Sequence, residues 1–158
     1  MAVIAFPQNG IKVRTVALGS GAPVPYVDAR GEIEVRLPAG LARDQQIAIT
    51  LEYEAIEPKG VVFSPDYVYT FFHTCHWMVC RDRPDDKATL TLSLTVPEGQ
   101  TAIASGVLVD KRSLGKAMSR QVWKKRWKER WEERVPSSPY LFGFAIGSFR
   151  APSAGIRA

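Results

Sequence analysis

The fold class is clearest in one part of the sequence, Tyr67 to Leu94, which reads YVYTFFHTCHWMVCRDRPDDKATLTLSL. This part contains both histidines and both cysteines of the chain, and its polar segment from Arg81 to Asp86 is typical of a sharp turn. Its last residues begin a run in which Leu90, Leu92, Leu94 and Val96 alternate with Thr or Ser. Such alternation predicts a β-strand with one buried face and one solvent-exposed face.

Similar short runs of alternating or β-branched residues occur on both sides of this strand, with Gly- and Pro-containing turns between them. Asn9-Gly10 is a hairpin-turn signal, and the runs are Ile11–Leu18, Glu32–Leu37, Gln46–Glu54, Thr101–Val109 and Tyr140–Phe149. Many short strands at close spacing predict an all-β fold, an antiparallel multi-stranded β-sandwich. We expect a single domain over residues 1–150, followed by a flexible tail at 151–158.

The segment from Ser113 to Arg134 fits this pattern less well, because it is rich in helix-favouring residues and contains no Pro. Trp123, Trp127 and Trp131 recur every fourth residue, which places them near one face of a helix or on one face of a strand. The spacing leaves both structures open, and one short helix near residues 113–119 is compatible with the composition.

The positive charge of the chain is concentrated in the same region. The chain carries a net charge of +5, and Lys111 to Arg134 alone contains ten Lys or Arg against three Glu. Two interpretations are open: a solvated charged surface, which we favour, and a patch for an anionic partner. The candidate residues for that patch are Lys124, Lys125, Arg126 and Lys128, and we expect neither nucleic acid nor a membrane as partner.

Length and composition are those of a globular protein with one core. The first ten residues carry no basic, apolar pattern typical of a signal peptide, and no apolar run approaches the ~20 residues of a membrane span. Cys75 and Cys80 do not form a disulfide framework, so we expect reduced thiols and a cytoplasmic location.

Three kinds of chemistry could use the histidines and cysteines. His73, Cys75, His76 and Cys80 are residue types that bind zinc, but on a strand they would point to opposite faces, so we predict no metal site. A Cys/His dyad would need an oxyanion hole, and no hydrolase, phosphate-binding or dinucleotide motif accompanies it. The third interpretation is plain sheet and turn.

Three segments carry a resemblance to a known family. The segment WMVCRDRPDDKATLTLSLTVPEGQTAIASG resembles the W-F-P-C-x-D-E-P-x-x-K-A-x-F-x-L-x-L-x-V-P pattern of aminopeptidase N-type zinc metallopeptidases, peptidase family M1. PSSPYLFGFAIGSF and LEYEAIEPKGVVF resemble later and earlier strands of the same family. The residues that fit the first pattern are Trp77, Cys80, Asp82, Pro84, Lys87, Ala88, Val96, Pro97, Ser105 and Gly106.

The resemblance implies the saddle-shaped N-terminal β domain of such an enzyme, which packs on a catalytic domain and helps to form the peptide cleft. The zinc ligands and the general base belong to that catalytic domain, so this chain is expected to hold no cofactor and to be inactive alone. Its catalytic-domain partner would be supplied in cis or in trans. The substrate-cleft candidates are Thr70, Phe72 and His73, and the structural turn comprises Trp77, Cys80, Asp82, Arg83 and Pro84.

The sequence departs from the family pattern in three ways. Thr70 stands where family members offer a Gln or Glu to the substrate amine, so amine recognition is not implied. The chain begins about two strands later than its relatives, and the resulting open edge favours a homodimer. The Trp-rich segment is longer than the family hairpin. The alternative function is a stand-alone binding module that uses residues 120–134 on an anionic or protein partner.

Overall fold

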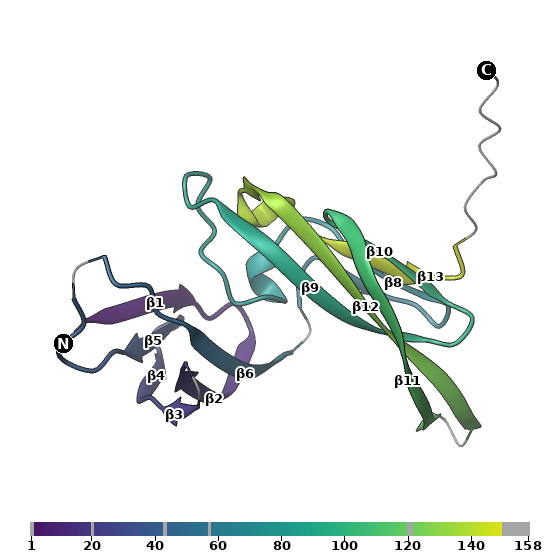
Figure 1. Ribbon diagram of the computed structural model, residues 1–158. Helices are drawn as coiled ribbons and strands as arrows, with labels where there is room; N and C mark the ends of the chain where they lie inside the picture. Colours follow the sequence, from purple (N-terminus) through teal and green to yellow (C-terminus); the bar gives the residue numbers. More distant parts are fainter. Residues whose placement is uncertain (1, 20, 43, 57, 120–121, 150–158) are drawn as a thin grey trace. The chain divides into compact units, whose positions relative to one another are not determined.

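The computed structural model describes residues 2–19, 21–42, 44–56, 58–119 and 122–149 (Figure 1). These residues form antiparallel β-sheets, and the helical elements within them are two short 3₁₀ helices, η1 (Thr74–His76) and η2 (Pro139–Leu141). The prediction of an all-β, antiparallel fold is therefore confirmed. The predicted tail, 151–158, lies outside the described residues.

The chain divides into two compact units, each of which is described by itself. Unit 1 comprises Met1–Gly60, Phe72–Asp86 and Ser138–Tyr140, and unit 2 comprises Val61–Phe71, Lys87–Ser137 and Leu141–Ala158. The single domain expected over residues 1–150 stays a prediction.

Unit 1 packs two three-stranded sheets over one apolar core. One sheet has the order β1-β5-β4 and the other β3-β2-β6. Ile33 and Val35 of β5 and Ile11 of β2 are fully buried, because alternation points them between the two sheets. The strands are β1 (Val3–Pro7), β2 (Ile11–Leu18), β3 (Ala22–Pro23), β4 (Tyr26–Ala29), β5 (Glu32–Arg36) and β6 (Ile49–Ala55).

The Asn9-Gly10 turn has the expected conformation, but the strands beside it do not form a hairpin. Asn9 and Gly10 both have positive φ, as a tight turn of this sequence requires. However, β1 pairs with β5 while β2 pairs with β6. The turn therefore passes the chain from one sheet of the sandwich to the other, which a dipeptide signal cannot reveal.

Unit 2 also contains two sheets, with the orders β10-β13-β8-β7 and β11-β12-β9. Leu94 and Val96 of β9 are buried with Ala102 of β10, and Leu92 and Trp131 pack beside them. The predicted apolar face of the Leu90–Val96 run is thus the inner face of this unit. The strands are β7 (Val61–Phe63), β8 (Tyr67–Thr70), β9 (Ala88–Pro97), β10 (Thr101–Ala104), β11 (Val107–Ser119), β12 (Val122–Ser137) and β13 (Phe144–Gly147).

The helix considered near residues 113–119 is wrong, because this segment is the second half of strand β11. It forms a long hairpin with β12 (Figure 1), and β12 pairs in turn with β9. Trp127 lies opposite Val96 and Trp131 lies opposite Leu92. The four-residue spacing of the tryptophans is therefore that of one strand face, and cross-strand packing outweighs the local helix propensity.

The core of unit 2 contains one charged side chain, Glu129 of β12, which is 0% exposed. Its Oε1 lies 2.7 Å from Lys111 Nζ, and the backbone N–H of Ala102 donates to Oε2 at 3.3 Å. Lys111 is half-exposed and also lies 5.7 Å from the ring centroid of Trp127. One ion pair, covered by an aromatic ring, therefore connects β11 and β12 and compensates the buried carboxylate.

We predict that Lys111→Met lowers the free energy of unfolding by about 2–3 kcal/mol, because it leaves the Glu129 carboxylate buried without its cation. The double variant Lys111→Met/Glu129→Gln should recover most of this loss, since it removes the uncompensated charge and keeps an acceptor for Ala102. Urea denaturation measures both. Arg112→Met, at the next position, is the control and should change stability by less than about 0.5 kcal/mol. Equal losses at Lys111 and Arg112 would contradict the account.

Candidate functional site

The outer face of β8 carries three aromatic side chains in a row. Tyr67, Tyr69 and Phe71 alternate with Val68 and Thr70, and the aromatic members are the more exposed ones. Tyr67 and Tyr69 are 45% and 39% exposed, and neighbouring ring centroids lie 6.0 and 6.2 Å apart. The usual arrangement, with large apolar residues inside and small or polar ones outside, is reversed on this strand.

A groove of about 880 Å³ lies along this face of unit 2. Its floor is strand β13, where Ala145 lies between Tyr69 and Ile103 in the register and Gly147 lies opposite Tyr67. A side chain at Gly147 would meet the Tyr67 Cβ and the Phe149 ring at 3.2 Å, so the small residue lets these groups close over the strand. We call these residues the aromatic groove: Tyr67, Tyr69, Ile103, Ala145, Gly147 and Phe149.

The polar groups beside the aromatic groove are engaged by the backbone of the sheet. Thr70 Oγ1 accepts from Phe144 N–H at 2.8 Å and donates to the Phe144 carbonyl at 3.2 Å. Ser105 Oγ accepts from Gly143 N–H at 3.0 Å. These hydroxyls hold β8, β10 and β13 together and do not form a nucleophile–base pair. The groove can therefore bury apolar surface, and its lining does not assemble a reaction centre.

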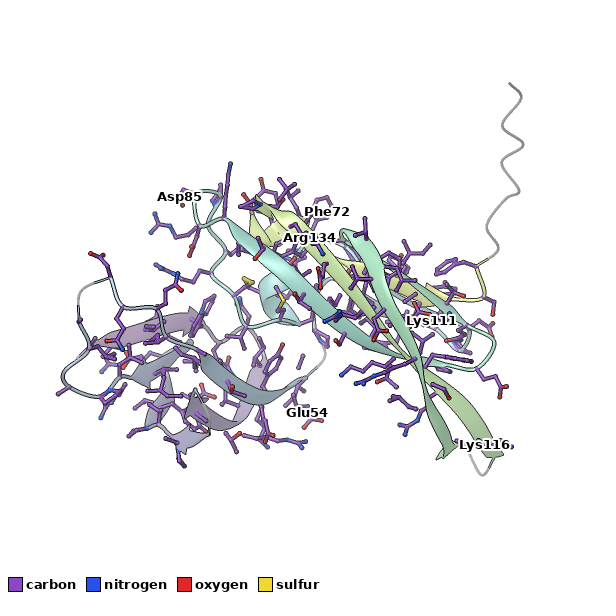
Figure 2. All side chains as sticks on the ribbon, in the orientation of Figure 1. Glu54, Phe72, Asp85, Lys111, Lys116 and Arg134 are labelled. Atoms are coloured by element: carbon purple, nitrogen blue, oxygen red, sulfur yellow. A yellow bond between two sulfur atoms is a disulfide. The ribbon has the colours of Figure 1, made fainter. Side chains whose placement is uncertain are left out.

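Unit 1 presents a different feature, the loop that follows Phe71. Phe72 and His73 both have left-handed backbone conformations, with φ of 45° and 47°, which non-glycine residues rarely adopt. The next residues form η1, in which Thr74 and Cys75 are buried while Phe72 is 73% exposed (Figure 2). Two consecutive strained residues that present an exposed phenylalanine are a reasonable recognition element.

A disulfide between Cys75 and Cys80 closes this loop, with the two Cα atoms 5.1 Å apart. The expectation of reduced thiols is therefore wrong. Its physical reason is η1, which turns the chain back so that residues five apart lie together, whereas an extended strand would keep them separated. Disulfides persist mainly in oxidising compartments, so the bridge argues against the cytoplasmic location, which stays a prediction.

Hydrogen bonds attach the loop to the sheets of unit 1. Asn9 Nδ2 donates to the Cys75 carbonyl at 3.3 Å, and the Tyr53 hydroxyl donates to the Trp77 carbonyl at 3.3 Å. Burial raises the pKa of the Tyr53 hydroxyl above its usual value, which keeps this donor protonated. The loop is therefore fixed at both ends of the disulfide-closed segment.

The two histidines of the loop lie close together, with ring centroids 5.4 Å apart in an edge-to-face arrangement. Burial lowers the pKa of His76, and the positive charges of His73 and Lys59 lower it further. His76 is thus held in its neutral form more strongly than an isolated histidine. The described residues contain no group of three or more His, Cys, Asp or Glu arranged to hold a metal, and the two cysteine sulfurs are bonded to each other.

The turn after Cys80 is held by arginine rather than by Asp82. Arg83 donates to both carboxylate oxygens of Asp85, at 3.1 and 2.8 Å, and this pairing lowers the pKa of Asp85. Ser138 Oγ donates to the Pro84 carbonyl at 2.7 Å. Within the described part of the chain, no hydrogen bond from an amide to the Asp82 side chain occurs, so the role expected for Asp82 belongs to Arg83 and Asp85.

The predicted site residues are distributed over separate parts of the structure. Thr70 borders the aromatic groove in unit 2, whereas Phe72 and His73 belong to the loop of unit 1. Of the proposed basic patch, Arg126 is exposed and Lys128 half-buried on β12, while the side chains of Lys124 and Lys125 lie outside the described residues. As substrate-cleft and partner-binding residues, these positions stay predictions.

Sequence reasoning missed the aromatic groove, although one signal for it was present. Tyr67, Tyr69 and Phe71 alternate with Val68 and Thr70, which by itself separates aromatic from smaller residues onto two faces. Alternation cannot say which of two apolar faces is the outer one. The small residues of the groove floor carry no local signal, because they matter only through their register with β8 and β10.

Comparisons with known proteins identify the fold. No protein-family model matches the sequence. Three solved structures resemble the chain: the M1 zinc metallopeptidase from Deinococcus radiodurans has a TM-score of 0.72 at 24% identity, covering 93% of this chain and 34% of that one. A two-domain M1 zinc metallopeptidase bound to L-tryptophan gives 0.72 at 25%, with 93% and 35%. Legionella pneumophila aminopeptidase A with aspartic acid gives 0.73 at 14%, with 95% and 18%.

These structures confirm the resemblance to M1 zinc metallopeptidases as a resemblance of fold. The chain spans about a third of the length of the M1 enzymes that it matches. Among the described residues, no helix is long and apolar enough to cross a membrane.

We predict that removing the Cys75–Cys80 bridge, in Cys75→Ser/Cys80→Ser, lowers the free energy of unfolding by about 2 kcal/mol, because the unfolded chain regains the entropy of a short closed loop. Thermal or urea unfolding of the variant and of reduced and oxidised wild-type protein measures this. Thiol titration of the denatured, unreduced protein should find no free cysteine. Two reactive thiols in that sample would contradict the bridge.

Proposed function

We propose that this chain is the N-terminal β domain of an M1-type zinc aminopeptidase, or a short relative of it, and that its work is structural. In this proposal the aromatic groove packs against a catalytic domain that supplies zinc and the hydrolytic groups. The observation that supports it best is an exposed apolar groove on a chain whose fold covers only a third of the matching enzymes. A surface of this kind is typical of a protein interface.

The composition of the aromatic groove suits a permanent partner. Its large residues are Tyr67, Tyr69, Ile103 and Phe149, and no Lys, Arg or Glu lines it. Interfaces between stable partners are depleted in charged residues at their centre and enriched in tyrosine and phenylalanine. Asp66, at one end of the groove, supplies a polar rim.

The loop of unit 1 would contribute to substrate contact in the same proposal. Phe72 is exposed on a backbone that the disulfide, η1 and two side-chain hydrogen bonds hold in place. A fixed, exposed aromatic side chain is suited to bind the apolar part of a peptide, and its strained backbone is consistent with a selected position. Thr70 and His73 remain the other cleft candidates.

The account predicts that the 158-residue chain forms a complex with a catalytic domain that lacks its own β domain. The probe is the part of the Deinococcus radiodurans metallopeptidase outside the matched third, co-expressed with this chain. Size-exclusion chromatography with light scattering measures the complex, and hydrolysis of aminoacyl p-nitroanilides measures activity. We expect complex formation and turnover together, and no turnover from this chain alone.

Tyr69→Lys tests the surface, because it places a charge at the centre of the aromatic groove. It should weaken the complex at least about tenfold, as loss of a central tyrosine does at many interfaces. Val135→Lys, on an exposed residue of β12 outside the groove, is the matched control and should bind like the unaltered chain. Equal binding of both variants, the absence of any complex, or turnover by the chain alone would refute the proposal.

A further inference from the structure

The β11–β12 hairpin extends beyond the sheet to which it belongs. Strand β12 pairs with β9 only from Arg126 onward, whereas β11 and β12 remain paired as far as Ser119 and Val122. The distal part of the hairpin is therefore two-stranded, and Figure 1 shows it continuing past the end of β9. A two-stranded ribbon in water has little stability of its own, so a partner that covers it would stabilise it.

This distal part is strongly and uniformly basic. Residues 112–128 contain seven Lys or Arg and no Asp or Glu. The register places Arg112 opposite Lys128 and Lys116 opposite Lys125, so like charges face each other across the hairpin. Such pairs are destabilising unless an anion lies near them.

The neutralising carboxylates lie elsewhere on the hairpin. Glu129 is paired with Lys111, and Glu132 is paired with Arg130 and Arg134. Within the described part of the chain, Arg112, Lys116, Arg126 and Lys128 make no ion pair, and Figure 2 shows Lys116 near the distal end of the hairpin, farther out than Lys111. The charge of this end is therefore available to an external anion.

Apolar residues accompany the basic ones around the turn. Met118 lies opposite Trp123, and Val122 lies opposite Ser119, so the two residues on each side of the turn include three apolar ones. Leu114, farther back on β11, is 40% exposed. Apolar residues at a hairpin tip with basic residues behind them match a bilayer surface, where Trp favours the interface and Lys and Arg favour anionic headgroups.

A nucleic acid is the other common polyanion, and the structure favours it less. Single-stranded nucleic acids are bound by stacking bases on exposed aromatic rings. Trp127 and Trp131 are not exposed in this way, because Lys111 lies over the Trp127 ring and Trp131 packs against the core of unit 2. Stacking therefore has no platform on the described part of the hairpin.

We propose that the distal β11–β12 hairpin, residues 112–128, binds the surface of anionic phospholipid membranes. The apolar residues beside the turn lie at the headgroup level, and the basic residues behind them contact the lipid phosphates. The contact is peripheral, since two strands of this length lie on the bilayer and do not cross it. It departs from the sequence-based expectation that no membrane is a partner, and it is independent of the docking through the aromatic groove.

The test is co-sedimentation of the full chain with sonicated vesicles of phosphatidylcholine alone or with 30 mol% phosphatidylserine (a composition chosen for about the charge of a cytoplasmic leaflet). We expect binding to the anionic vesicles only, weakening as salt rises from about 50 to 300 mM. The variant Lys124→Gln/Lys125→Gln/Arg126→Gln/Lys128→Gln should lower the affinity about tenfold or more. Its thermal unfolding, followed by circular dichroism, shows that it is folded.

The matched control removes four exposed cations from unit 1, in Lys12→Gln/Arg30→Gln/Arg36→Gln/Lys59→Gln. It should bind the anionic vesicles like the unaltered chain. An equal loss in this control would mean that net charge alone drives binding and would overturn the proposal. Tighter binding to a DNA duplex than to the vesicles at equal salt would reassign the hairpin to nucleic acid, and no binding to anionic vesicles would also overturn it.

Discussion

The sheet β10-β13-β8-β7 has two faces, and the described chain buries only one of them. Val68, Ala102 and Ile146 face the core of unit 2, whereas Tyr67, Tyr69 and Ile103 face outward. Because water exposure of apolar surface costs roughly 25 cal/mol per Å², this outer face is stabilised by any partner that covers it. The small floor of Ala145 and Gly147 shapes that face into a groove, which gives the partner a defined place.

The distribution of polar groups agrees with a structural role. Carboxylates, imidazoles and hydroxyls of the described chain are paired with cations or with the backbone, as for Glu129, Asp85 and Thr70. The strained and exposed part, Phe72 and His73, is held by a disulfide and contains no nucleophile–base pair. The two units thus present an apolar docking surface and a rigid recognition loop, while the hairpin supplies a separate basic surface.

Sequence alternation was sufficient for the strands and for the family, because a half-buried strand writes its two faces directly into the residue order. It failed where a third partner decides the outcome. The tryptophans of β12 fit a helix as well as a strand until β9 is placed beside them, and Asn9-Gly10 suggests a hairpin whose strands join different sheets. The Cys75–Cys80 bridge depends on η1, which breaks the periodicity that the prediction assumed.

The account depends most directly on whether the aromatic groove is covered by a catalytic domain. Amide hydrogen–deuterium exchange of the chain, alone and with the catalytic part of the Deinococcus radiodurans metallopeptidase, measures this without any substitution. The account predicts slower exchange at residues 67–71, 101–105 and 143–149 in the complex, and unchanged exchange at the distal hairpin. Protection confined to the hairpin, with no change along β8, β10 and β13, would contradict it.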